Sequence, residues 1–200
     1  MPYNMDFALE VIRRIAKGID DKFEFTEEAT ELYKKLIQFF HGDTDFPGEI
    51  TKGIMLNGTT GSGKTLAMKV MSIYQKIDNV KFIMNRRVYR MNFDVIHVND
   101  MVNDFMNNAF DGIQVYTNRY VFCMDDIGTE IEEVKYYGNK LDVISHIISE
   151  RQTKRLLTFA TSNYPIDILE DKYGDRIISR MHALFNFITV KDKDFRRVTT

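Results

Sequence analysis

The segment NGTTGSGKTLAMK, residues 57 to 69, constrains this chain more than any other stretch of its sequence. Four residues separate Gly58 from the run Gly63, Lys64 and Thr65, and this spacing is the phosphate-loop pattern G-x-x-x-x-G-K-[ST]. Because glycine makes up roughly 7% of an average sequence, a chance match in a chain of this length has a probability on the order of 1%. The pattern gains weight when a strand precedes it and a helix follows it.

The residues on either side of the loop predict such a strand and such a helix. The apolar run from Ile54 to Leu56 stops at a glycine, as a short buried strand does. Over residues 64–77, apolar residues recur at the steps of three and four that are typical of an amphipathic helix: Leu66, Ala67, Val70, Met71 and Tyr74. The order of strand, glycine loop and helix outweighs the alternative of an ordinary glycine-rich turn.

A loop of this kind binds phosphate. Glycine lets the backbone curl without Cβ clashes, so that N–H groups point at phosphate oxygens, and the helix N-terminus adds its positive end. We expect Lys64 to reach the β- and γ-phosphates and Thr65 to place its hydroxyl on Mg²⁺, which implies ATP and Mg²⁺ as cofactors. The predicted nucleotide-binding residues are Gly58, Thr59, Thr60, Gly61, Ser62, Gly63, Lys64, Thr65 and Leu66.

Two aspartates follow a second apolar run. In RYVFCMDDIGTE, the residues Val121 to Met124 lead directly into Asp125 and Asp126. A buried parallel strand has this composition, and its carboxyl end would lie beside the phosphate loop. There Asp125 would hold Mg²⁺, through a water molecule, and Asp126 would orient or deprotonate the attacking water. An acidic turn is the alternative, and the phosphate loop weakens it.

Composition limits the architecture and the partners. A chain of 200 residues with 44% hydrophobic content fits one globular domain, which we divide into a helical extension with a linker over 1–48 and a core over 49–200. The net charge of −2 excludes a global basic field, so any contact with DNA must be local. The lone Cys123, the charged first twenty residues and the lack of a long apolar run predict a cytoplasmic protein without membrane contact.

The remaining pattern predicts further helices and strands. In the extension, Asp6 is expected to cap one helix, while Thr26 caps a second helix that ends at Gly42. The later segments, in chain order, are a strand over 93–98, a helix over 99–110 capped by Asn99 or Asp100, a helix over 138–154, a strand from Leu156 to Ala160, and a last strand that ends at Val190.

Polar residues near the end of the chain are weaker candidates. Asn163 follows the strand that ends at Ala160 and would hydrogen-bond the attacking water or the γ-phosphate, although TSNYP also suits an ordinary strand-to-turn transition. Arg176 and Arg180 are four residues apart and would share one face of a helix. The histidines show no metal-ligand spacing and are interpreted as structural: His41, His97, His146 and His182.

Residues 81–90 form a basic segment that the phosphate-loop pattern does not require. They contain Lys81, Arg86, Arg87 and Arg90 and no acidic residue. We interpret the segment as a solvated hairpin in preference to a contact with nucleic acid. If single-stranded DNA is bound, these cations and the aromatic residues Phe110 and Tyr116 are the candidates, because stacking and phosphate attraction need such side chains.

Four motifs in a fixed order resemble the AAA+ ATPases. They are the phosphate loop, FCMDDIG, FATSNYP and GDRIISRM, and they span roughly residues 50 to 190. The chain is most similar to the branch with DnaC-type helicase loaders and IstB-type transposition helpers. The resemblance makes Lys64 and Thr65 the Walker A pair, Asp125 and Asp126 the Walker B pair, and Asn163 sensor 1. Arg180 then resembles the arginine finger that reaches the nucleotide of a neighbouring subunit, with Arg176 as the second choice.

The resemblance implies a fold and a task. The expected fold is a three-layer α/β P-loop NTPase with a mainly parallel five-stranded sheet, a short helical N-terminal extension and no lid domain. The expected function is an ATPase that loads a replicative helicase onto DNA, as a homo-oligomer whose ATP sites are shared between subunits. A nucleotide-gated DNA adaptor for a transposase is the alternative, and a small-molecule kinase ranks third.

Overall fold

A five-stranded parallel sheet forms the centre of the protein in the computed structural model, which describes residues 3–84, 87–131, 134–136 and 139–190. The spatial order of the strands is β4-β5-β8-β1-β9, and all neighbours in this sheet pair in parallel. The predicted mainly parallel sheet is therefore confirmed. The strands are β1 (Gly53–Gly58), β4 (Val95–His97), β5 (Val121–Asp125), β8 (Leu157–Ser162) and β9 (Phe185–Val190).

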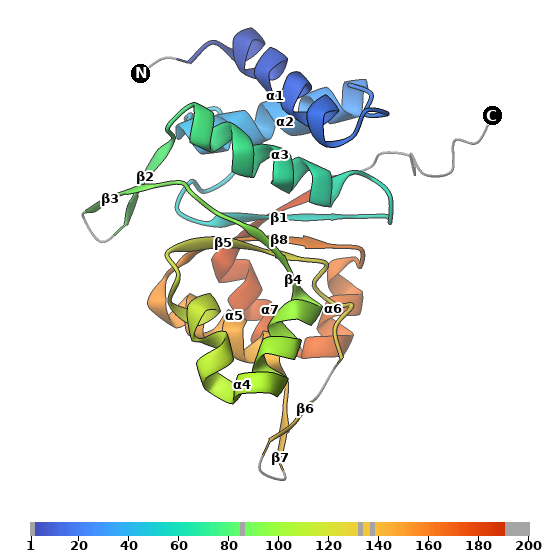
Figure 1. Ribbon diagram of the computed structural model, residues 1–200, viewed down its shortest axis with the longest axis vertical. Coiled ribbons are helices and arrows are strands. Elements are labelled where there is room, and N and C mark those ends of the chain that lie inside the picture. Colours follow the sequence, from blue (N-terminus) through green and yellow to red (C-terminus); the bar gives the residue numbers. More distant parts are fainter. Residues whose placement is uncertain (1–2, 85–86, 132–133, 137–138, 191–200) are drawn as a thin grey trace, which may run out of the picture.

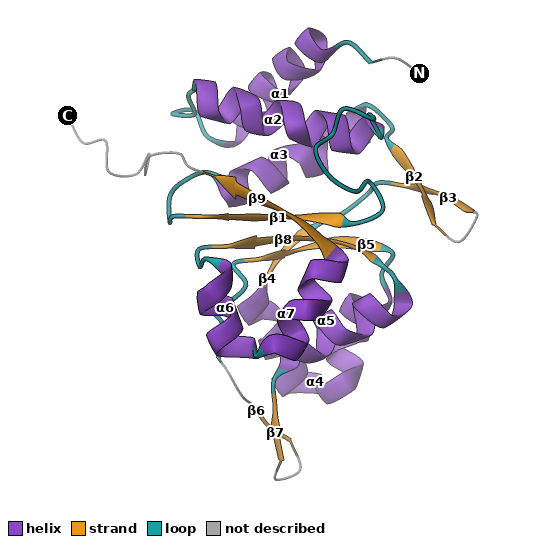
Figure 2. Ribbon diagram, turned by 180° about the vertical axis from the view of Figure 1, so that it is seen from behind, coloured by secondary structure: helices purple, strands orange, loops and turns teal. Residues whose placement is uncertain are grey.

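Helices cover both faces of this sheet, which makes three layers (Figures 1 and 2). On one face lie α1 (Met5–Ile19), α2 (Glu27–His41) and α3 (Lys64–Ile77). On the other face lie α4 (Val98–Asn118), α5 (Val143–Lys154), α6 (Ile166–Tyr173) and α7 (Asp175–Leu184). Both faces of each central strand are thus buried, which explains why β1, β5 and β8 are almost entirely apolar until they reach their carboxyl ends.

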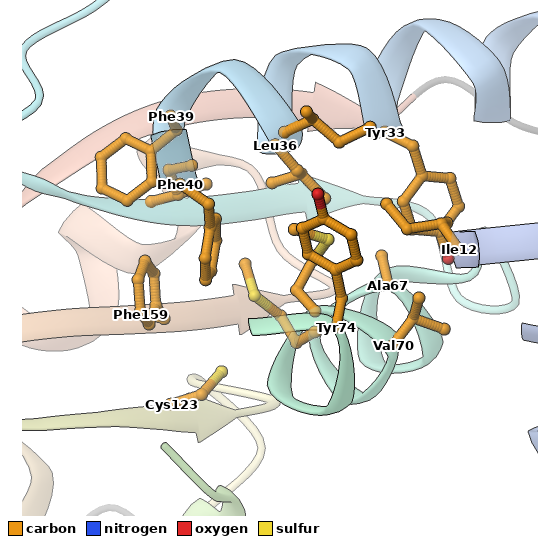
Figure 3. Close-up of a cluster of buried hydrophobic side chains, with 14 of the residues drawn as sticks. Ile12, Tyr33, Leu36, Phe39, Phe40, Ala67, Val70, Tyr74, Cys123 and Phe159 are labelled. Atoms are coloured by element: carbon orange, nitrogen blue, oxygen red, sulfur yellow. The ribbon is translucent and has the colours of Figure 1, made fainter. Parts of the chain in front are cut away.

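The N-terminal extension packs directly on the sheet beside α3 (Figure 3). Phe40 of α2 stacks on Phe159 of β8 with a centroid separation of 5.4 Å, and Phe39 meets the same ring edge-on at 5.8 Å. Such ring pairs are worth about 0.5–1.5 kcal/mol beyond the area that they bury. The extension therefore belongs to the same hydrophobic core as the phosphate-loop helix.

Two hairpins extend from the three layers (Figure 1). Strands β2 (Lys81–Met84) and β3 (Arg87–Arg90) pair antiparallel, so the hairpin predicted for the basic segment is confirmed for its described residues; Arg86 lies outside them. Strands β6 (Val134–Tyr136) and β7 (Asn139–Leu141) form the second hairpin. The helix expected over 138–154 was wrong at its start, because Leu141 pairs with Val134 and the helix begins only after Asp142.

Local capping decides where the helices begin. Thr26 and Gly42 delimit α2 as predicted, but Asn4 caps α1 in place of Asp6, which lies in the first turn. Asp142 caps α5 by accepting a hydrogen bond from the Ser145 amide. The cap of α4 is His97, in place of the expected Asn99 or Asp100, and β4 is correspondingly shorter than the strand predicted over 93–98.

Helix α4 continues beyond its predicted end at residue 110 and is broken at Ala109. Ala109 has φ 51° and ψ −139°, a conformation that residues with a Cβ rarely adopt. The hydroxyl of Tyr116 donates to Asp104 across this break, and Tyr116 is buried. A buried ring cannot stack on a base, so the structure removes Tyr116 from the candidates for DNA contact.

Candidate nucleotide-binding site

The phosphate loop lies between β1 and α3, as predicted. Gly63 is the N-cap of α3 and has φ 83°, a conformation that glycine adopts without strain. At Gly58, a Cβ atom would lie 2.3 Å from the carbonyl oxygen of Val190 in β9, so only glycine allows the two strands to end side by side there. The backbone conformation of Gly63 and the close approach at Gly58 explain why the motif has glycine at these two positions.

Lys64 is directed back into the loop. Its ammonium group donates to the carbonyl oxygens of Gly58 (2.9 Å) and Thr59 (2.8 Å) and to the hydroxyl of Ser62 (3.2 Å). The side chain is 4% exposed although it carries a charge. A buried ammonium held by loop oxygens lies where phosphate oxygens could become its partners.

Asp125 and Thr65 are in contact, as their predicted shared role requires. The Thr65 hydroxyl donates to Asp125 Oδ1 at 2.9 Å, and the Thr161 hydroxyl donates to the same oxygen at 2.7 Å. Asp125 is the last residue of β5, and Thr161 lies near the end of the neighbouring β8. The carboxyl ends of β5 and β8 and the first turn of α3 thus bring together two hydroxyls and a carboxylate, which are oxygen ligands suited to Mg²⁺.

Asp126 and Asn163 are also in contact. Asn163 Nδ2 donates to Asp126 Oδ1 at 2.9 Å, and the Asp126 amide donates to the hydroxyl of Thr161. Asp126 has φ 60°, which turns the chain sharply after β5. A left-handed non-glycine residue costs on the order of 1–3 kcal/mol and persists where its surroundings hold it. The predicted Walker B and sensor 1 residues therefore form one hydrogen-bonded unit.

His97 lies beside this unit, although the sequence pattern marks all four histidines as structural. Its Nε2 lies 3.6 Å from Asp126 Oδ2, and its Nδ1 accepts the Asn99 amide at 3.2 Å. Because Nδ1 accepts, the neutral ring carries its proton on Nε2, which faces the carboxylate. A signal was present in the sequence: His97 ends an apolar strand, and the sheet pairs it with Asp125.

A cavity of about 620 Å³ adjoins these residues. One wall is the phosphate loop from Thr60 to Leu66 with Asp126 and Asn163. The opposite wall comes from the extension and consists of Asp20, Lys22, Phe23, Glu24, Ala29, Leu32 and Tyr33. We call these surfaces the phosphate wall and the extension wall. The extension wall carries no sequence motif that would predict it.

Comparisons with known proteins agree with this arrangement. No protein-family model and no curated protein matches the chain, but solved structures do. DnaI has a TM-score of 0.64 and 20% identity over 92% of both chains. The DnaC helicase loader has a TM-score of 0.60 and 18% identity over 86% of this chain and 95% of its own.

A third solved structure, AMPPCP-bound DnaA from Aquifex aeolicus, has a TM-score of 0.57 and 16% identity over 87% of this chain and 50% of its own. The protein has the AAA+ P-loop fold. At these identities the similarity establishes the architecture, and it confirms the resemblance seen in the four motifs.

The described residues contain no helix long and apolar enough to cross a membrane. They also contain no cluster of three or more His, Cys, Asp or Glu side chains suited to a metal ion.

The two candidate arginine fingers of this AAA+ fold lie on α7, and neither is among the described residues that line the cavity. Arg180 Nη1 donates to the Ser149 carbonyl oxygen at 3.1 Å and to Gln152 Oε1 at 3.4 Å, which holds it against α5. Arg176 is exposed. The structure therefore does not bring either arginine to the nucleotide site of its own chain.

A buried acidic residue supports the turn after β5 in this AAA+ fold. Glu130 is 5% exposed; it accepts the Gly128 amide at 2.9 Å and pairs with Lys172 of α6 at 3.2 Å. Lys172 also donates to the carbonyl oxygens of Gly128 and Glu130. Burial, and then the neighbouring Glu130 charge, raises the pKa of Tyr173, whose protonated hydroxyl donates to Glu130. This network fixes the segment that begins at Asp126 to the helix that follows Asn163.

Proposed function

We propose that this protein is an ATPase that loads a replicative helicase onto DNA. The observation that carries the proposal is that separate motifs converge in one cleft: Thr65 contacts Asp125, and Asn163 contacts Asp126. The AAA+ architecture shared with DnaI and the DnaC helicase loader supports the same task.

The residues present fit a nucleotide with its magnesium ion. The phosphates would lie in the phosphate loop, with Lys64 as their cation, and the base would lie against the extension wall. Thr65 and Asp125 would hold the ion, which neutralises charge on the phosphates when it is bound. A magnesium site of this type needs few protein carboxylates because phosphate and water supply the other oxygens.

Asp126 is the proposed general base. Its carboxylate accepts from Asn163 on one oxygen and faces His97 on the other. Asn163 would keep the carboxylate oriented and would itself contact the water or the γ-phosphate. His97, with its Nε2 proton toward the second carboxylate oxygen, would help to orient Asp126.

The arginines on α7 would complete the site of a neighbouring subunit. Arg176 is exposed and could enter another chain's cleft directly, whereas Arg180 must first leave its partners Ser149 and Gln152. Contacts that join one face of a subunit to a different face of the next are heterologous and give rings or open spirals. ATP would then favour assembly, and hydrolysis would reverse it.

Assembly and loading are tested in two measurements. Light scattering gives the mass in solution with and without a slowly hydrolysed ATP analogue, and then with single-stranded DNA; nucleotide-dependent growth is expected. Unwinding of an oligonucleotide annealed to closed circular single-stranded DNA by the replicative helicase of the same organism then reports loading, which is expected to need this protein and ATP. A monomer in every condition, or unwinding that is independent of the protein, would overturn the proposal.

The variants Arg176→Ala and Arg180→Ala identify the arginine finger. The finger is the arginine whose loss stops ATP turnover while ATP binding persists.

A further inference from the structure

The β2–β3 hairpin has a firm base and an exposed body. Val80 and Met91, which flank it, are buried and joined by a hydrogen bond of 2.9 Å between the Met91 amide and the Val80 carbonyl oxygen. Beyond this base, Ile83 is 76% exposed and Val88 is 64% exposed. Figures 1 and 2 show the hairpin projecting from the rest of the molecule. An isolated two-stranded hairpin is marginally stable in water, so its exposed composition needs a reason.

One face of the hairpin places like charges opposite each other. Lys81 pairs with Arg90 across the strands, and Ile83 pairs with Val88 next to them. Lys81 and Arg90 are both exposed. Directly opposed like charges destabilise a strand pair, and the segment 81–90 contains no acidic residue to offset them. An anionic ligand would remove this repulsion.

The other face carries aromatic rings and a third cation. Phe82 lies 5.7 Å from Tyr89, and Tyr89 lies 4.3 Å from Tyr120, which immediately precedes β5 and is 49% exposed. Arg87 is exposed and close enough to act electrostatically on Tyr120, whose pKa is raised chiefly by its hydrogen bond with Tyr89. Half-exposed rings beside an arginine can stack on bases while the cation binds a phosphate.

The surface continues along the amino-terminal edge of the sheet. Val121 of β5 pairs with Leu157 of β8, so the connection holding Tyr120 lies beside the one holding Arg155, which is exposed. Asp94 is the nearest acidic residue after the hairpin in the sequence, and Arg119 neutralises it at 2.5 Å. Because β5 runs from Tyr120 toward Asp125, this surface lies roughly 15 Å from the magnesium ligands, at the opposite end of the strand.

We infer that the β2–β3 hairpin and Tyr120 bind single-stranded nucleic acid, with Lys81, Arg87 and Arg90 on phosphates and Tyr89 and Tyr120 against bases. An acidic protein segment would use the cations, but it would leave the exposed rings beside Arg87 without a role. A single strand satisfies both features because its bases are free to stack. The inference deepens the proposed function by placing the DNA contact, and its test does not depend on ATP turnover.

The test is a binding titration in which fluorescence anisotropy reports the bound fraction of the probe. The probe is a fluorescein-labelled oligo-thymidine of about 20 nucleotides, titrated at several salt concentrations with and without an ATP analogue. The triple variant Lys81→Gln, Arg87→Gln, Arg90→Gln removes the three cations. Since each phosphate contact on a single strand contributes a slope of about −0.7 in log K against log salt, the slope should shrink by about 2. Tyr120→Leu should weaken binding about tenfold with the slope unchanged.

Two controls make the result decisive. Lys17→Gln, Lys35→Gln, Lys69→Gln removes the same formal charge from α1, α2 and α3 and should leave the binding and its slope unchanged. Lys64→Ala should still bind the oligonucleotide in the absence of nucleotide, which separates failure of this site from failure of the ATPase. If the hairpin triple variant behaves like the control triple, or the wild type binds polyglutamate and not oligo-thymidine, the inference is overturned.

Discussion

The two walls of the nucleotide cleft are built in different ways. The phosphate wall comes from one loop and from residues at strand ends, so its members are positioned by the backbone of the sheet itself. The extension wall comes from the loop between α1 and α2 and from the first half of α2, and its position depends on how those helices pack. One cleft can therefore combine a wall that a local sequence motif specifies with a wall that only the packing of helices specifies.

The forces that hold the two walls also differ. The phosphate wall is held by charges and short hydrogen bonds, such as those of Asp125 with Thr65 and Thr161. The extension wall is held by rings: Phe25 stacks on Tyr33 at 5.5 Å, and Phe23 meets Tyr33 edge-on at 6.2 Å. Substitutions in the first wall should therefore change chemistry or binding strongly, and substitutions in the second should change affinity modestly.

The largest effect is expected from Asp126→Asn. Removing the proposed general base should lower the turnover number about 1,000-fold, within the range that such catalysis contributes. Affinity for a fluorescent ATP analogue should persist, because the phosphate loop is intact. A steady-state ATPase assay measures the first quantity and a fluorescence titration the second. Asp171→Asn, exposed on α6, is the matched control. Turnover close to that of the wild type would exclude Asp126 as the base.

Lys64→Ala should act on binding. Its ammonium makes three hydrogen bonds in the loop and would transfer them to phosphate, so nucleotide affinity should fall about 100-fold. Isothermal titration calorimetry gives the affinity directly. Lys69→Ala changes an exposed lysine of the same helix and should have no effect. Equal losses in the two variants would mean that the loop does not bind phosphate.

Glu130→Gln tests the network that supports Asp126 in the phosphate wall. The change leaves Lys172 facing a neutral amide and loosens the segment that holds Asp126 at φ 60°. Turnover should fall about tenfold, because small displacements of a catalytic group are costly. The affinity for nucleotide should not change. The control is Glu170→Gln on the exposed side of α6. A variant that loses affinity and thermal stability but keeps its turnover number would reduce Glu130 to a structural role.

Phe23→Ala tests the extension wall. Losing one ring contact with a base should weaken ATP binding about fivefold, which corresponds to about 1 kcal/mol. Tripolyphosphate, which has no base, should bind the variant and the wild type equally. Phe7→Ala removes a ring that is 69% exposed on α1 and should change neither affinity. If ATP and tripolyphosphate weaken together, Phe23 supports the fold of the cleft and not the base.

The smallest effect concerns the attachment of the extension wall. His41 of α2 contacts the Tyr74 hydroxyl at 2.9 Å and Asp78 at 3.2 Å, stacks on Tyr3, and lies near Asp43. Burial lowers its pKa below the ordinary value of 6.5, despite the opposing charge of Asp78. The unfolded chain then binds more protons than the folded chain between these two pKa values. This contribution to stability is therefore present above pH 6.5 and is lost as the pH falls toward the folded value.

Urea unfolding at several pH values measures this loss. His41→Gln should flatten the dependence of stability on pH just below 6.5. A pH dependence that is the same in His41→Gln and the wild type would contradict the assignment.

The contrast between the walls also explains what could be predicted from sequence. Lys64 was predictable from the phosphate-loop pattern, and the positions of Asp125 and Asn163 were predictable because each lies at or just after the end of an apolar strand and parallel strands align their carboxyl ends. Phe23 was not predictable, because no local sequence pattern indicates that α2 packs on Phe159. The predicted start of α4 failed for a local reason: its cap is His97, whose ring nitrogen takes the role of the expected Asn99 or Asp100.

The central claim is that both walls bind one nucleotide. Isothermal titration of the wild type with a non-hydrolysable ATP analogue and, separately, with tripolyphosphate, both with Mg²⁺, tests it most directly. One site per chain is expected for each ligand, with an analogue affinity about fivefold or more above that of tripolyphosphate. Equal affinities would mean that the extension wall contacts no base, and absence of binding by either ligand would contradict the nucleotide site itself.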